Sequence, residues 1–200
     1  GLVESGLVVT AVCADCHGAH DVFYAADRRS TLHPSKVAGT CGKCHYFVAE
    51  RLAASVHGRG AELGAVATRL APGGKQQRKP CCTDCHQGHD QPEPTSLAFR
   101  LQLPNRCGNC HADFANRYRL SLHGELTQLG YEPAAKCSDC HGHHSIFPVD
   151  DPASCLAPGN RPQTCGRCHI RAVANFTDFD PHANYLDADR YPVLQGIYAW

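Results

Sequence analysis

Six copies of the pattern Cys-x-x-Cys-His constrain this 200-residue chain more than any other feature of its sequence. The copies use 12 of the 14 cysteines. Random placement at this composition would give roughly 0.07 copies. The pattern therefore indicates one chemistry repeated along the chain. The copies begin at Cys13, Cys41, Cys82, Cys107, Cys137 and Cys165.

The spacing fits covalent attachment of haem. Two thiols separated by two residues add to the two vinyl groups of one haem as thioethers, and the next residue, histidine, ligates the iron as the proximal ligand. We therefore predict six haem c groups, each with one iron. The predicted attachment residues are Cys13, Cys16, Cys41, Cys44, Cys82, Cys85, Cys107, Cys110, Cys137, Cys140, Cys165 and Cys168. The predicted proximal ligands are His17, His45, His86, His111, His141 and His169.

Other uses of paired cysteines explain less of the pattern. Zinc ribbons contain Cys-x-x-Cys pairs, but zinc does not require a histidine after every second cysteine. A thioredoxin-like site uses one such pair in a strand–helix–strand unit, and we find no such unit here. A disulfide scaffold would not fix the same two-residue gap six times.

The six motifs form three pairs. The first member of each pair reads Cys-x-Asp-Cys-His-x-x-His, and the second reads Cys-Gly-x-Cys-His. A recurring internal period indicates one structural unit used repeatedly. We predict one domain, 1–200, built of three two-haem repeats at about 1–59, 60–128 and 129–200.

The predicted fold class is mainly α with much coil and almost no β-structure: short helices and loops wrapped around a closely packed haem array. Apolar residues four apart predict helices over 46–58 and 112–124, each ending in His-Gly, because glycine commonly stops a helix. The third copy is looser and has Pro181 before His182. Gly, Pro and charged residues predict loops at 71–80, 91–96 and 150–162.

The chain has no methionine, so its irons would take a second histidine instead of the His/Met ligation of small cytochromes. Opposite ligands of one iron have Cα atoms roughly 12 Å apart, whereas three residues span at most about 10 Å. His20 should therefore serve an iron other than that of His17, and the same holds for His89 with His86. The predicted distal ligands are His20, His57, His89, His123, His144 and His182, with His33 and His143 as further candidates.

Five further residues carry open alternatives. Cys81 and Cys155 lie outside the six motifs, and they could form a disulfide in an oxidising compartment. Asp15, Asp84 and Asp139 occupy one place in the three first-type motifs. Each would either tune a haem or cap its loop.

With its doubled motifs, the chain resembles the multihaem c-type cytochromes of the cytochrome c3 and c7 class. The Cys-x-Asp-Cys-His-Gly-x-His and Ser-x-His-Gly patterns are similar to those of periplasmic respiratory multihaem subunits, some of which continue into a membrane cytochrome b. Haem c is attached outside the bacterial cytoplasm, so we expect a protein that is periplasmic, extracellular or on the outer face of a membrane. Two alternatives apply to the apolar segment 191–200: it packs on the domain, or it begins a membrane anchor. Residues 4–13 resemble the segment between Gly124 and Cys137, so we expect either a fragment of a longer chain or a first repeat that differs from the others.

The leading functional hypothesis is electron transfer between a respiratory donor and a redox protein partner, without enzymatic activity. The partner would be a membrane cytochrome b or quinol-linked subunit, or copies of the chain itself in a polymeric wire. The alternative is a haem enzyme that reduces a nitrogen or sulfur oxyanion at one open iron. Nucleic acid is excluded as a partner because 19 Lys and Arg balance 19 Asp and Glu.

Overall fold

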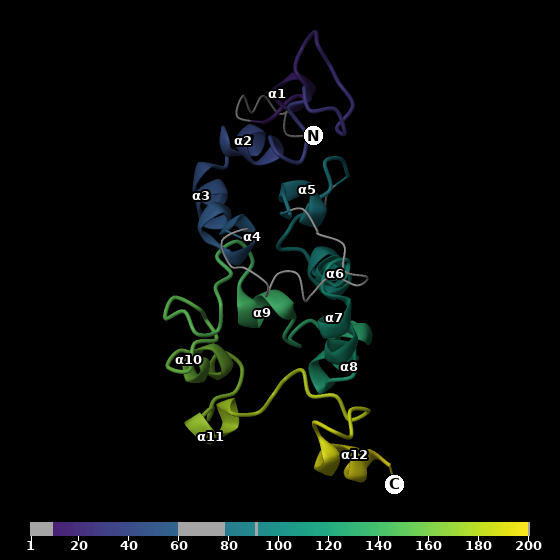
Figure 1. The fold of residues 1–200 in the computed structure, drawn as a ribbon, viewed down its shortest axis with the longest axis vertical. Coiled ribbons are helices and arrows are strands. Elements are labelled where there is room, and N and C mark those ends of the chain that lie inside the picture. Colours follow the sequence, from purple (N-terminus) through teal and green to yellow (C-terminus); the bar gives the residue numbers. More distant parts are fainter. Residues whose placement is uncertain (1–9, 60–78, 91, 200) are drawn as a thin grey trace.

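A computed structural model describes residues 10–59, 79–90 and 92–199. The described residues form short helices joined by turns and coil, with no strand among them, so the predicted mainly α class is confirmed. The helices run along an elongated molecule, from α1 near one end to α12 at the other (Figure 1). Their bounds are α1 (Cys13–His17), α2 (Val37–Gly42), α3 (Tyr46–Ala54), α4 (Val56–Arg59), α5 (Cys82–Cys85), α6 (Leu97–Gly108), α7 (Ala112–Arg119), α8 (Leu122–Gln128), α9 (Cys137–His141), α10 (Arg161–Gly166), α11 (Ala174–Thr177) and α12 (Pro192–Tyr198).

The first-type motifs form the single-turn helices α1, α5 and α9. In each, the motif aspartate accepts a hydrogen bond from the backbone N–H of the residue before the first cysteine. These bonds run from Val12 to Asp15 (2.8 Å), from Cys81 to Asp84 (2.7 Å) and from Lys136 to Asp139 (2.7 Å). Of the two alternatives for these aspartates, the capping role is the one with a visible contact.

The second-type motifs lie across a helix end. The first cysteine belongs to α2, α6 or α10, and the histidine follows one turn later. The backbone N–H of that histidine donates to the carbonyl of the first cysteine at 2.9 Å in all three copies: His45 to Cys41, His111 to Cys107 and His169 to Cys165. Because a helical turn brings positions i, i+3 and i+4 together, each motif gathers its two thiols and its imidazole.

The predicted helices over 46–58 and 112–124 are each broken before their histidine, which corrects the expected ending at His-Gly. Helix α3 ends at Ala54 and α4 begins at Val56, while α7 ends at Arg119 and α8 begins at Leu122. The serine of Ser-x-His-Gly explains the break. Ser121 Oγ donates to the Tyr118 carbonyl (2.7 Å) and accepts from the N–H of Gly124 (3.2 Å), so it closes one helix and caps the next.

Glycine follows the histidine because the two helices meet closely. A Cβ at position 124 would overlap the carbonyl oxygen of Tyr118 and lie 2.7 Å from the Cα of Arg119. A Cβ at Gly58 would lie 2.5 Å from the Cα of Ala53. Glycine therefore permits a close approach between helices here and does not stop the helix.

The third copy departs from the other two. It keeps only the four-residue helix α11, and His182 follows in coil, where its N–H donates to Asp180 (2.9 Å). Helix α12 has seven residues and is joined to the preceding segment by stacking of Tyr185 and Tyr198 at 4.6 Å. Val193 and Ile197 on this helix are largely exposed.

Candidate haem-binding sites

The structure brings ten of the fourteen histidines together as five pairs. Every pair joins one motif histidine to one histidine from outside the motifs. The ring centroids are 6.0 to 6.2 Å apart. The pairs are His17 with His89 (6.0 Å), His111 with His57 (6.2 Å), His86 with His144 (6.0 Å), His169 with His123 (6.0 Å) and His141 with His182 (6.2 Å).

This separation suits an iron held between two imidazoles. A metal–imidazole bond is about 2.0 Å long, and the ring centre lies about 1.1 Å behind the nitrogen, so two opposite ligands place their ring centres about 6.2 Å apart. An incidental contact between rings could fall anywhere from about 4.5 to 7 Å. The five ring-centre distances fall within a narrow range, and each pair joins a motif histidine to a histidine from outside the motifs. The pairs therefore fit one common arrangement, in which both imidazoles ligate the same iron.

Four of the five pairs connect neighbouring repeats, in both directions, and the fifth, His141 with His182, lies within repeat 3. Repeat 2 gives His89 back to His17 of repeat 1, and repeat 1 gives His57 forward to His111. In the same way, repeat 3 gives His144 back to repeat 2, and repeat 2 gives His123 forward to repeat 3. None of the five pairs joins His20, His57 or His89 to the histidine of its own preceding motif.

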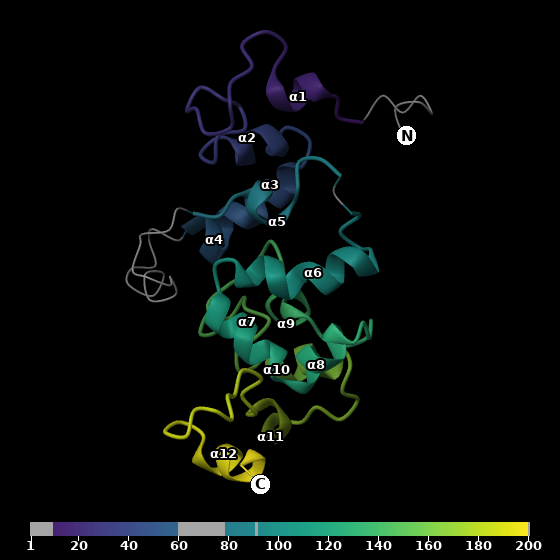
Figure 2. The ribbon, with the colours of Figure 1, turned by 90° about the vertical axis from the view of Figure 1, so that its right-hand side faces the viewer.

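The motif helices contact one another in sequence order. Helix α1 touches α2, α2 touches α5, α5 touches α6, α6 touches α9, and α9 touches α10. The views in Figures 1 and 2 place this series along the long axis. Thiols of successive motifs also lie near one another: burial and the neighbouring Cys41 thiol raise the pKa of Cys82, and the neighbouring Cys137 thiol raises the pKa of Cys107. The six candidate sites therefore form one continuous row.

Polar contacts hold the exchanged segments in place. The N–H of Val56, one residue before His57, donates to the carbonyl of Ile146 (2.8 Å) in repeat 3. Arg59 pairs with Asp151 at 3.8 Å. Arg100 of repeat 2 lies 3.5 Å from Asp139 in the third first-type motif.

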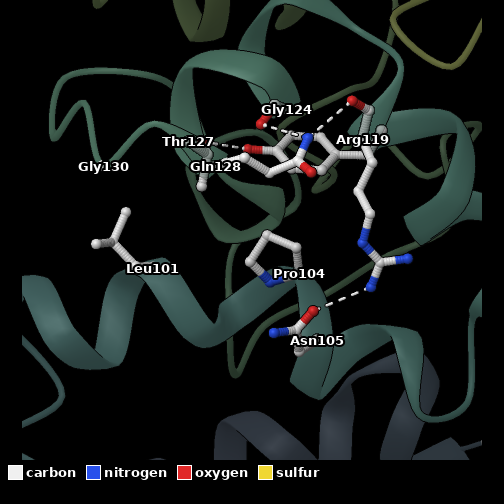
Figure 3. Close-up of a pocket in the computed structure, with 9 residues that line it drawn as sticks. Leu101, Pro104, Asn105, Arg119, Gly124, Thr127, Gln128 and Gly130 are labelled. Atoms are coloured by element: carbon white, nitrogen blue, oxygen red, sulfur yellow. Dashed lines mark hydrogen bonds between the residues drawn. The ribbon is translucent and has the colours of Figure 1, made fainter.

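Tyr118 supports the segment that carries His123. Its side chain is 7% exposed, and its hydroxyl contacts Thr127 Oγ1 (2.7 Å) and donates to the carbonyls of Ala135 (2.9 Å) and His123 (3.4 Å). Burial raises the pKa of Tyr118 to about 12. Figure 3 shows the same junction, where Gln128 donates to the carbonyls of Arg119 and Gly124 (3.1 and 3.3 Å).

Phenylalanine rings lie against several paired imidazoles. Phe99 stacks on His86 at 5.5 Å, Phe114 meets His182 at 5.4 Å, and Phe176 lies 4.8 Å from His169. Neither these rings nor Tyr118 were predicted from the sequence as residues of the site. Their signal was their place in the helices beside each second-type motif, but that spacing does not say which imidazole each ring meets.

Burial lowers the pKa of seven paired histidines: His57, His86, His111, His123, His141, His144 and His182. Desolvation disfavours the charged imidazolium, so these rings are kept neutral. A neutral imidazole has the free nitrogen lone pair that a metal ligand needs.

Four predicted ligands are not paired in this way among the described residues. His20 and His45 are exposed and make no ring contact there. His143 meets only its neighbour His144, with ring centres 4.8 Å apart, which is too close for an iron between them. His33 Nδ1 instead contacts the hydroxyl of Ser35 (2.7 Å).

The two remaining cysteines, Cys81 and Cys155, each have a counterpart in another repeat that is not a cysteine, and no disulfide joins them. Cys155 corresponds to Thr31, because the carbonyl of each accepts a 2.7 Å hydrogen bond from a threonine hydroxyl nine residues on. Ala157 likewise repeats the turn contacts of His33. Cys81 is buried and occupies the position that Val12 and Lys136 occupy before the other first-type motifs.

The chain matches no family model, no curated protein and no solved structure. No group of three or more His, Cys, Asp or Glu suited to a metal ion occurs among the described residues. In the same part of the chain, no helix has the length and apolarity to cross a membrane.

Proposed function

We propose that this protein transfers electrons through six covalently attached c-type haems. The observation that carries the proposal is the set of five imidazole pairs, each joining a Cys-x-x-Cys-His histidine to a second histidine at 6.0 to 6.2 Å. When bound, haem supplies an iron that takes up and releases one electron. The residues present fit that group in donor type, number and spacing.

The paired histidines would hold an iron between two imidazoles. External ligands would then be kept away, and little would have to rearrange when the charge changes. Phe99, Phe114 and Phe176 restrict the rings they touch, and burial keeps the imidazoles neutral. These features favour electron transfer over substrate chemistry, which needs an open position.

The order of the motif helices gives the proposed path. Consecutive motifs are in contact from α1 to α10, so electrons would enter near one end of the long axis and leave near the other. Reciprocal histidines lock neighbouring repeats together, which fixes the spacing of the sites. A redox protein partner would dock at each end. A membrane cytochrome b, a quinol-linked subunit and another copy of this chain are the candidates, at a periplasmic or extracellular location where haem c is attached.

A reductase remains the second candidate because of one observation. His45 is exposed, and no second imidazole faces it among the described residues. An iron held there would have an open position, and the next residue in the chain, Tyr46, has a hydroxyl that donates to Glu50 (2.7 Å). Turnover of nitrite or sulfite that is lost in Tyr46→Phe would favour the enzyme.

The direct test is to express the chain with a c-type haem maturation system and measure its intact mass and reduced visible spectrum. We expect a mass increase equal to six haems and sharp c-type bands. Replacing both thiols of one motif, as in Cys137→Ala with Cys140→Ala, should remove one haem. The matched control replaces Cys81 and Cys155, which lie outside the motifs, and should keep all six. A protein without covalent haem would overturn the proposal.

A further inference from the structure

Two unpaired histidines lie at one end of the row of sites. His20 and His45 both belong to repeat 1 and are exposed. Their counterparts in the other repeats are paired: His89 and His144 correspond to His20, while His111 and His169 correspond to His45. The lack of partners is therefore specific to repeat 1.

The two complete junctions follow one rule. At each junction, the upstream repeat donates its Ser-x-His-Gly histidine forward to a second-type motif. The downstream repeat donates the last histidine of Cys-x-Asp-Cys-His-x-x-His backward to a first-type motif. His57 and His89 make this exchange between repeats 1 and 2, and His123 and His144 make it between repeats 2 and 3.

Repeat 1 contains the two histidines that would take part in one more such exchange. His20 is the histidine that a repeat donates backward, and His45 is the one that receives a histidine donated forward. We propose that the end of repeat 1 bearing His20 and His45 is a ligand-exchange interface that takes a further two-haem repeat of the same type. The Ser-x-His-Gly histidine of that repeat would be the second ligand at His45, and His20 would serve its first-type motif. This inference rests on the proposed function.

At the opposite end of the row of sites, both motif histidines of repeat 3 are already paired. Repeat 3 has no Ser-x-His-Gly sequence, and its His182 serves His141 of the same repeat. Its other motif histidine, His169, is paired with His123. A second copy of this chain docking through repeat 3 would therefore have no Ser-x-His-Gly histidine to give.

The occupant that fits is a repeat preceding repeat 1 on the same polypeptide. Residues 4–13 resemble the segment that leads from Gly124 to Cys137, where a Ser-x-His-Gly helix comes first.

Carbon monoxide binding to the dithionite-reduced, six-haem protein tests this inference, at concentrations where sedimentation shows a monomer. We expect one carbon monoxide per protein. His20→Ala and His33→Ala should leave that number at one, while His123→Ala should raise it to two by opening the site at His169. A monomer that binds none overturns the inference, because a described histidine then serves His45. Closure seen only in a dimer, and lost in His20→Ala, also overturns it, because two copies then exchange His20.

A second variant of this chain would supply the second histidine ligand at His45. A copy of residues 112–136 in place of residues 1–12 puts Ser-Leu-His-Gly before Cys13 at the spacing that Ser121–Gly124 has before Cys137. We expect carbon monoxide binding to fall from one to none, and to return to one when the copied histidine is changed to alanine. Binding that persists at one in both proteins overturns the inference. The intact mass separates this failure from failure of the proposed function, because six haems remain attached in the former case.

Discussion

Gly124→Ala tests how the Ser-x-His-Gly segment positions its histidine. An added Cβ would overlap the carbonyl oxygen of Tyr118 and lie 2.6 Å from its carbonyl carbon, whereas carbon atoms in contact are normally about 3.5 to 4.0 Å apart. Helix α8 must therefore move away from α7 by about 1 Å. Overpacking of this kind costs about 1–3 kcal/mol, and the helix propensity of alanine returns about 0.5–1 kcal/mol. We expect a net loss of about 1–2 kcal/mol in the free energy of unfolding.

Denaturant unfolding of the haem-loaded protein measures this loss, followed in the far ultraviolet to report on the helices. The same displacement should carry His123 away from His169, so the variant should also bind one more carbon monoxide than the parent protein. Gly196→Ala is the matched control, because it lies inside helix α12 and nothing lies within 4 Å of a Cβ there, so it should gain only the helix propensity of alanine, about 0.5–1 kcal/mol. If Gly124→Ala is as stable as this control and keeps its ligands, the close approach of α7 and α8 does not explain the glycine.

Tyr118→Phe removes the buried hydroxyl that contacts Thr127 and Ala135, so the free energy of unfolding should fall by about 1–3 kcal/mol, whereas Tyr24→Phe, at a residue 91% exposed, should leave it unchanged. His89→Ala should add one carbon monoxide site, at the iron of His17, and His33→Ala should add none. Acid should also weaken the fold: burial lowers the pKa of His57 and His111 below 6.5, so the unfolded chain binds more protons. The free energy of unfolding should therefore fall as pH drops below about 6.5, in a titration read by circular dichroism.

These predictions would each be contradicted by a specific result. Equal stability of Tyr118→Phe and Tyr24→Phe would mean that the hydroxyl contacts do not stabilise the α7–α8 junction. A carbon monoxide site opened by His33→Ala but not by His89→Ala would reverse the ligand assignment. Stability that is constant from pH 6.5 to 5 would mean that the buried imidazoles are not kept neutral by the fold.

The helical class and the local form of each motif follow from the sequence. A Cys-x-x-Cys-His pentapeptide spans little more than one helical turn, so its own spacing gathers its thiols and imidazole. The break at Ser121 was not predicted, because the stripe of Phe114, Tyr118 and Leu122 suits one continuous helix. In the structure Tyr118 is buried and Leu122 is 70% exposed, since the serine ends one helix and begins the next.

The sequence does not predict which histidine faces which motif; it only excludes some of the pairings. Chain length shows that His20 cannot reach the iron of His17 and that His89 cannot reach that of His86. It does not show which repeat each one meets, because that depends on contacts such as Val56 with Ile146, ninety residues apart in the chain. His20 was expected to be a distal ligand by repeat position, and the structure places no motif histidine beside it among the described residues. The position of a histidine within its repeat predicts its role where two repeats meet. His20 would act where another repeat meets the start of repeat 1, and the described structure contains only the contact of repeat 1 with repeat 2.

The most direct test of the account is an anomalous difference map, recorded at the iron edge, from crystals of the haem-loaded protein. We predict six iron peaks in a row along the molecule. Five should lie midway between His17 and His89, His57 and His111, His86 and His144, His123 and His169, and His141 and His182, and the sixth should lie at His45. Irons bridging other histidines, or fewer than six irons in a chain with all its cysteines intact, would contradict the account.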